Sequence, residues 1–187
     1  MKLDIHLRVE KPKDKFDIKK EIFSWVEIIV FTIIFMSILM TVVFRMSPVD
    51  GESMEPTLQD CDRIVTTNIH GAYHYNDVVV IRRKDDTTLV KRIIALSGDK
   101  IDINFETGSV YVNDKLLSEP FINEITKNRE NFVGPVIVPQ GHVFVMGDNR
   151  NRSDDSRIAK IGMIDKRNIL GKVIFRIFPF NKMRKIE

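Results

Sequence analysis

One stretch of the chain is apolar almost without interruption. Residues 22–44 contain a single charged side chain, Glu27. As an α-helix, these 23 residues rise about 34 Å, enough to cross a hydrocarbon core of about 30 Å. The run is longer than the apolar core of a cleavable signal peptide, and no Ala-x-Ala site follows it. The pattern therefore predicts an uncleaved transmembrane anchor at residues 22–44.

The charges on the two sides of this anchor predict its orientation. Residues 1–20 carry seven Lys and Arg, whereas residues 45–61 carry only Arg45. Basic residues favour the cytoplasmic side of a membrane. We therefore expect residues 1–21 to form a basic cytoplasmic tail, and residues 45–187 to lie outside the cytoplasm after a single crossing.

Beyond the anchor, short segments alternate between apolar and polar residues. Alternation with a period of two is typical of strands that are buried on one face. The strands are expected at residues 63–67, 77–81, 88–96, 100–105, 110–112, 142–146 and 169–177. Asn113-Asp114, between two apolar runs, predicts a tight hairpin. The sequence therefore predicts a mainly β fold, with an antiparallel β domain over residues 45–187.

One part of this domain is expected to leave the sheet. Residues 118–140 are polar and contain three prolines, which remove backbone donors that a central strand needs. We expect a long excursion here, within a variable region at about residues 104–140.

Composition restricts the class of protein. The chain has 187 residues, of which 43% are hydrophobic, enough for one domain and an anchor. Its net charge of +3 is too small and too evenly spread to indicate a nucleic-acid binder. The single cysteine, Cys61, excludes an internal disulfide and a multi-cysteine metal site. We expect Cys61 to be a packed thiol and not a nucleophile.

Ser53 is the first candidate for chemistry. It lies in Asp50-Gly51-Glu52-Ser53-Met54-Glu55-Pro56-Thr57-Leu58, where Gly51 permits close backbone approach and Pro56 favours a turn. A serine in such a loop commonly serves only to satisfy backbone groups. The loop alone therefore leaves a structural and a catalytic role open.

Lys91 is the second candidate. Strand periodicity places it on one face with Leu89, Ile93 and Ala95. One interpretation is a gatekeeper of a strand edge, or an amine that reaches solvent. The other is a general base, for which the amine must be neutral. A free lysine is neutral only about four times in ten thousand at pH 7, so this role needs its pKa lowered by about three units.

Histidines offer alternatives to Lys91. His70 and His74 have the i, i+4 spacing of a metal pair, but Gly71 weakens a helix there and no Glu follows His70. A Ser-His-Asp triad could use Ser53 with His70, His74 or His142, because triads form in space and not in sequence. Both alternatives stay open at this point.

Four segments, taken in order behind the anchor, resemble type I signal peptidases. They are DGESMEPTL, NDVVVI, KRIIALSGD and GDNRNRSDDSR, and they extend from Gly51 to Arg157. The chain is similar to the short bacterial, Gram-positive-like members of this family of serine-lysine dyad peptidases.

The resemblance implies a role for each matching residue. Ser53 matches the nucleophile and Lys91 the general base. Ser153 matches a serine that orients the lysine, and Asp155 and Arg157 match a supporting pair. The Ser53 backbone N–H is the first oxyanion donor, whereas Gly51 stands where some relatives supply a serine hydroxyl, so the second donor is unassigned. The resemblance implies no cofactor and no metal.

The resemblance also implies the substrate and the location. The substrates are secretory preproteins, cut after small residues at −1 and −3 through an acyl-enzyme. The enzyme is expected in the plasma membrane, in contact with the bilayer and near the secretion translocon. Met54 or residues 175–180 are candidates for a surface that faces lipid.

Two other classes remain alternatives. A self-cleaving serine-lysine peptidase of the repressor type would need an N-terminal DNA-binding domain, where this chain has a tail and an anchor. A membrane-tethered β domain that only binds partners would not need both Ser53 and Lys91.

Overall fold

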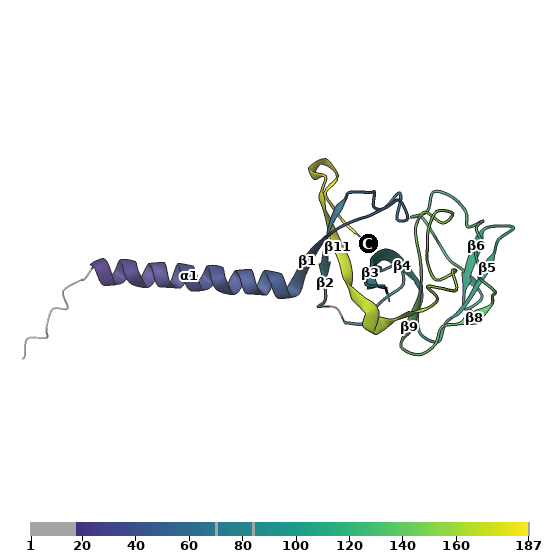
Figure 1. Cartoon of the computed structure of the whole chain (residues 1–187), viewed down its shortest axis with the longest axis horizontal. Helices are drawn as coiled ribbons and strands as arrows, with labels where there is room; N and C mark the ends of the chain where they lie inside the picture. Colours follow the sequence, from purple (N-terminus) through teal and green to yellow (C-terminus); the bar gives the residue numbers. More distant parts are fainter. Residues whose placement is uncertain (1–17, 70, 84, 187) are drawn as a thin grey trace, which may run out of the picture. The chain divides into compact units, whose positions relative to one another are not determined.

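A computed structural model of the protein describes residues 18–69, 71–83 and 85–186. The chain forms two compact units, with the boundary between Leu39 and Met40. Most of the predicted cytoplasmic tail, residues 1–21, falls outside the described residues. The second unit contains all the strands of the structure (Figure 1).

Helix α1 (Ile18–Val43) occupies the predicted anchor. Its residues Ile18–Leu39 are exposed, have a mean hydropathy of 2.4, and are long and apolar enough to cross a membrane. The helix begins before the predicted residue 22 and ends one residue early, because Phe44 is the first residue of a strand. The backbone of Phe44 pairs with Thr67 on the neighbouring strand. Backbone N–H and C=O groups that would bond within a longer helix are satisfied by this strand pairing instead.

The larger of two sheets has eight strands in the order β1-β2-β11-β3-β4-β9-β10, with β12 paired to β11. All its strand pairs are antiparallel, and the sheet curls (Figure 1). The strands are β1 (Phe44–Pro48), β2 (Arg63–Thr67), β3 (Val78–Arg82), β4 (Thr88–Ala95), β9 (His142–Met146), β10 (Ile164–Asp165), β11 (Ile169–Phe178) and β12 (Arg184–Lys185). Two short 3-10 helices, η1 (Lys166–Asn168) and η2 (Phe180–Lys182), flank β11.

The smaller sheet has four antiparallel strands in the order β7-β6-β5-β8. They are β5 (Lys100–Asn104), β6 (Ser109–Val112), β7 (Lys115–Leu116) and β8 (Val136–Ile137). The predicted hairpin joins β6 to β7, and both turn residues have positive φ, 52° at Asn113 and 63° at Asp114. These are the conformations that a two-residue hairpin requires.

The predicted antiparallel β domain is confirmed, and all seven predicted strands are present with bounds within two residues. Sequence periodicity missed β1, whose first residue it assigned to the anchor, and the two-residue strands β8, β10 and β12, while β7 was expected only as the second arm of the predicted hairpin. Two residues are too few to show an alternation. The predicted excursion at residues 118–140 holds only β8.

The core of the second unit consists of three apolar clusters. One cluster joins the two sheets, and in it Phe132 from the excursion packs edge-to-face on Phe144 with ring centroids 5.7 Å apart. A second contains Met54, Leu58 and Ile186, which come from the Ser53 loop and from the end of the chain. The third lies between strands β3, β4, β9 and β11.

A bulge in β4 corrects one prediction about Lys91. The register with β9 shifts between Ile93 and Ala95, so the alternation of faces stops after Ile93. Ile94 and Ala95 both pack into the cluster between the sheets, whereas Ile93 packs into the third cluster. Ala95 therefore does not share the face of Lys91 and Ile93.

Candidate active site

Ser53 lies on the loop that joins β1 to β2, residues 49–62, called here the nucleophile loop after the role predicted for Ser53. Two backbone hydrogen bonds tighten it: Glu55 N–H donates to Glu52 O at 3.1 Å, and Leu58 N–H donates to Met54 O at 2.9 Å. Met54 and Leu58 are fully buried, at 1% and 0% exposure. The two apolar side chains on either side of this turn thus anchor the loop and leave Ser53 half-buried.

Lys91 meets Ser53 from the middle of the larger sheet. Its Nζ lies 2.6 Å from Ser53 Oγ, although β1 and β4 are four steps apart in the strand order. The Lys91 residue is 1% exposed and pairs with the fully buried Val79 on β3. The curl of the sheet therefore brings the two predicted residues together, and the ammonium does not reach open solvent as a snorkelling lysine would.

Burial changes the protonation of Lys91. Loss of solvation lowers the pKa of Lys91 from 10.5 to about 8, although the carboxylates of Asp155, Asp154 and Asp148 oppose the shift. With this pKa, about one Lys91 in ten is neutral at pH 7, against about three in ten thousand for an ordinary lysine. The lowered pKa makes this amine competent as a proton acceptor near neutral pH.

The pH dependence of the reaction at Ser53 tests this pKa. If neutral Lys91 is the form that reacts, the rate should rise about tenfold between pH 7 and pH 9 and level off above pH 9. The measurement is the initial rate for one substrate across this range. A rate that is already level at pH 7 would mean that the reacting base titrates well below Lys91.

A third segment, the loop at residues 147–157, closes the site. Asn149 N–H donates to Ser53 O at 3.0 Å. Gly147 lies so close to Ser53 that a Cβ there would be 2.4 Å from Ser53 O and 2.2 Å from Ser153 Oγ. Only glycine fits this contact, because both distances are far below van der Waals separation.

Ser153 is buried beside Ser53 and Gly147 but does not bond to Lys91. Within the described part of the chain, Ser153 Oγ has no hydrogen-bond partner. A hydrogen bond between Ser153 and Lys91, by which Ser153 was expected to orient the lysine, is therefore not formed in this structure. The only partner of Lys91 Nζ among the described side chains is Ser53 Oγ.

Asp155 and Arg157 form a fully buried ion pair. Arg157 Nε donates to Asp155 Oδ1 at 2.9 Å and Nη2 donates to Oδ2 at 2.8 Å. Asp155 also accepts from Gly147 N–H at 3.1 Å, while Arg157 donates to the carbonyls of Arg150 and Asn128 at 2.6 and 2.8 Å. The pair thus holds Gly147 in place and ties the loop to the excursion. Neither side chain is exposed to a substrate.

Ser53 and Gly51, the two positions considered in the sequence analysis for the oxyanion, differ in their backbone N–H groups in the described part of the chain. Ser53 N–H has no acceptor among the described residues. Gly51 has a positive φ of 85°, and its N–H donates to Asp60 Oδ1 at 2.8 Å. The Gly51 position therefore supplies neither a hydroxyl nor an unbonded N–H, and the second donor is still unassigned.

The other candidates lie away from Ser53 or outside the described residues. The His74 ring faces Asp77 at 3.9 Å and His142 Nδ1 faces Gln140 O at 3.0 Å, while His70 is not described. No group of three His, Cys, Asp or Glu among the described residues is arranged to hold a metal. In the part that the structure covers, no histidine contacts Ser53.

Cys61 corrects another prediction. Its side chain is exposed and not packed, and Sγ lies 3.4 Å from Asp60 Oδ2. The packed-thiol interpretation is wrong because Cys61 adopts a positive φ of 64° in a turn that points outward. The neighbouring Asp60 carboxylate raises the pKa of this thiol, which disfavours the reactive thiolate.

Comparison with known proteins identifies the family. The family model described as "Signal peptidase, peptidase S26" matches residues 22–178. Signal peptidase I of Bacillus licheniformis is 37% identical over 180 residues, which cover 90% of this chain and 95% of that protein. Signal peptidase IB of Staphylococcus aureus (strain COL) is 32% identical over 184 residues, which cover 89% and 94%. The chain belongs to the signal peptidase I family.

Members of this family remove signal peptides from preproteins, and the chain is thus a type I signal peptidase, a serine hydrolase. The resemblance inferred from the four motifs is confirmed. A crystal structure of a signal peptidase I from Enterococcus faecalis V583 is 26% identical, with a TM-score of 0.46, and covers 55% of this chain and 97% of that one.

The structure adds three residues to this signal peptidase site. Arg92 donates from Nε to Asp148 Oδ1 at 2.8 Å and from Nη2 to Oδ2 at 2.7 Å, with both side chains buried. Thr57 Oγ1 donates to Asp148 Oδ2 at 2.5 Å. All three residues lie inside the quoted motifs: Arg92 follows Lys91, Asp148 follows Gly147 and Thr57 follows Pro56. The sequence pattern does not show that these polar side chains are buried and contact one another.

Proposed function

We propose that this signal peptidase works through a Ser53-Lys91 dyad. The 2.6 Å approach of Nζ to Oγ at a buried lysine supports this proposal most strongly. Ser53 Oγ attacks the scissile carbonyl carbon while neutral Lys91 takes the hydroxyl proton. Lys91 then protonates the leaving amine, and an acyl-enzyme ester remains on Ser53. Lys91 takes a proton from water as the water oxygen attacks this ester, and it returns the proton to Ser53 Oγ as the acid product leaves.

The Ser53 backbone and three further residues, Ser153, Asp155 and Arg157, assist the proposed dyad. We propose that Ser53 N–H donates to the oxyanion, because it is the unbonded backbone donor at the reacting atom. Asp155 and Arg157 keep the 147–157 loop in place. Ser153 Oγ is buried and has no hydrogen-bond partner among the residues that the structure describes. It can accept a hydrogen bond from Lys91 once the lysine carries the transferred proton.

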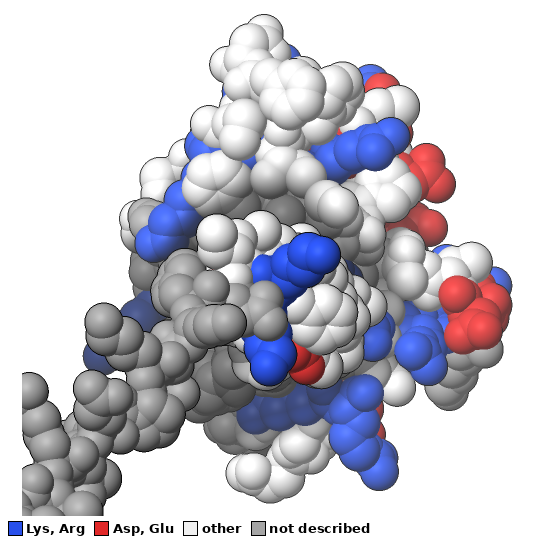
Figure 2. All heavy atoms as spheres, turned by 90° about the vertical axis from the view of Figure 1, so that its left-hand side faces the viewer, with Lys and Arg blue, Asp and Glu red and all other residues white. Residues whose placement is uncertain are grey.

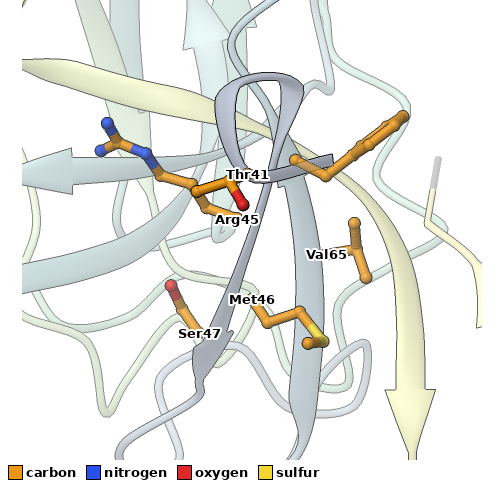
Figure 3. Close-up of a pocket in the computed structure, with 6 residues that line it drawn as sticks. Thr41, Arg45, Met46, Ser47 and Val65 are labelled. Atoms are coloured by element: carbon orange, nitrogen blue, oxygen red, sulfur yellow. The ribbon is translucent and has the colours of Figure 1, made fainter. Parts of the chain in front are cut away.

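The edge strand β1 offers a place for an extended peptide substrate. β1 is paired on one side only, with β2, and its last residue, Pro48, is five residues before Ser53. An open groove of about 840 Å³ lies along it, lined by Thr41, Phe44, Arg45, Met46, Ser47 and Val65 (Figure 3). We propose that the signal peptide adds to this edge as a strand, which leads its scissile bond toward Ser53.

Cleavage of a defined preprotein tests the function. We expect the detergent-solubilised chain to cut a preprotein with Ala at −3 and −1 directly after the −1 residue, as N-terminal sequencing of the product would show. A Trp at −1 should reduce the rate about a hundredfold or more, because a pocket for a small side chain cannot admit the indole. Trp at −2 is the matched control and should have a much smaller effect. Cleavage at another bond, or equal rates for −1 and −2 variants, contradicts the proposed specificity.

We propose a single membrane crossing for this enzyme, with residues 1–21 in the cytoplasm and residues 45–187 outside the plasma membrane, where the translocon releases preproteins. Lipid contact by Met54 is ruled out by its 1% exposure. Phe180 and Met183 are 77% and 49% exposed beside basic residues Lys182 and Arg184, a combination suited to the headgroup region. On the face in Figure 2, Lys and Arg are spread among Asp and Glu and do not form a single block.

A further inference from the structure

The end of the chain contacts the nucleophile loop. β11 and β12 form a hairpin, residues 174–186, called here the C-terminal hairpin. In it Arg176 lies opposite Arg184, and Ile186 N–H donates to Ile174 O at 3.1 Å. This hairpin reaches residues 57–62 of the nucleophile loop, more than a hundred residues away in the sequence.

Thr57 receives the central contacts of the hairpin. Its carbonyl accepts from Arg184 Nη2 at 2.8 Å and from Arg176 Nη1 at 3.4 Å. Its hydroxyl donates to Asp148, which Arg92 holds from the other side. A carbonyl bonded to two guanidinium groups is fixed by charge-assisted hydrogen bonds. The residue four positions after Ser53 therefore joins the C-terminal hairpin to the 147–157 loop.

Two other contacts add to this attachment. Lys182 Nζ donates to Gln59 Oε1 at 2.6 Å. Ile186, 4% exposed, packs in the same apolar cluster as Met54 and Leu58. The side chain next to Ser53 thus rests in part on the last residues of the chain.

We propose that Arg184 is a positioning residue for Ser53. By bonding to Thr57 O it holds the nucleophile loop against Asp148, and so keeps Ser53 Oγ within bonding distance of Lys91 Nζ. The proposal rests on the proposed roles of Ser53 and Lys91. Arg184 is exposed, so its removal leaves no buried charge unpaired. Arg176 is unsuitable for the test, because it is buried and ion-paired with Asp62 at 2.9 Å.

Arg184→Met removes the donor and keeps the length of the side chain. We expect kcat for the Ala-x-Ala preprotein at pH 7 to fall about tenfold, since small misplacements of a nucleophile are costly. The midpoint of the pH profile should move above that of the wild type, because a looser loop admits water to Lys91 and weakens the desolvation that lowers its pKa. Backbone amides of residues 53–58 should exchange hydrogen for deuterium faster.

Two variants make the result specific. Arg184→Lys keeps one donor and should restore most of the rate and of the amide protection. Arg167→Met removes an exposed arginine of η1 that is ion-paired with Asp165 at the end of β10. This variant should change neither kcat, nor the pH midpoint, nor amide exchange. Unchanged kcat, pH midpoint and exchange in Arg184→Met would overturn the proposal, as would a lower unfolding temperature without faster exchange at residues 53–58. Amide exchange can be measured without activity. A folded chain that fails to cleave would therefore refute the proposed function, and the exchange rates of residues 53–58 would still test the role of Arg184.

Discussion

Replacing Lys91 by methionine is expected to reduce cleavage at least about a thousandfold at every pH, because it removes the proposed proton acceptor, and no other base among the described residues contacts Ser53 Oγ. Methionine has nearly the same length and no charge, so it can occupy the buried position of the Lys91 side chain without disturbing the sheet. The measurement is the rate of preprotein cleavage, with circular dichroism as evidence of folding.

The same substitution should stabilise the fold, in a way that depends on pH. The folded-state pKa of Lys91 is lowered to about 8, whereas an unfolded lysine keeps its ordinary pKa. Protonation of Lys91 therefore destabilises the folded chain relative to the unfolded chain. This destabilisation is fully present below pH 8 and disappears as the pH rises from about 8 to 10.5. Its size follows from the shift, about 3 kcal/mol. Lys91→Met should therefore raise the free energy of unfolding at pH 6 and have little effect at pH 10.5.

Lys100→Met is the matched control for this experiment. Lys100 is also a strand lysine, but it is partly exposed and pairs with Asp114 at 2.5 Å in the smaller sheet. Its replacement should leave the cleavage rate unchanged and bring no gain in stability at pH 6. Substantial activity in folded Lys91→Met would refute the dyad and direct attention to a histidine base.

Alternation along the sequence predicted strands such as β2, β5 and β11, in which buried residues alternate with more exposed ones, whereas β3 and β9 are buried along most of their length. Alternation failed to predict features that are caused by pairing with a strand elsewhere in the sequence. The bulge after Ile93 arises from pairing with β9, and Phe44 becomes part of a strand because Thr67 on β2 offers it a partner. Both depend on strands that are distant in the sequence.

The candidate site shows the same division. Ser53 and Lys91 could be proposed from motif resemblance, yet only the curl of the larger sheet brings them to 2.6 Å. Arg92 and Asp148 are charged residues that a pattern places at the surface, but mutual neutralisation lets them be buried. Cys61 is small and apolar enough for the core, and only its turn conformation exposes it. Contacts between distant segments therefore decide what sequence periodicity leaves open.

Replacing Ser53 by alanine is expected to reduce cleavage to less than about one part in ten thousand, because no acyl-enzyme can form. The loss should exceed that caused by a defect in positioning, since Met54, Leu58 and Thr57 still hold the loop. The intermediate gives a direct measurement. After an acid quench during turnover, mass spectrometry of wild-type chain should show a Ser53 peptide heavier by the acyl fragment of the substrate, and Ser53→Ala should show no such adduct.

Ser109→Ala provides the control, because Ser109 on β6 bonds to Thr107 at 2.9 Å in the smaller sheet and should leave both rate and adduct unchanged. The comparison with Lys91→Met then separates the two proposed roles. A base is needed for attack and also for hydrolysis of the ester, so Lys91→Met should form the adduct slowly and retain it once formed. Cleavage by folded Ser53→Ala at more than trace rates, or an adduct on another residue of the wild-type chain, would assign the nucleophile elsewhere.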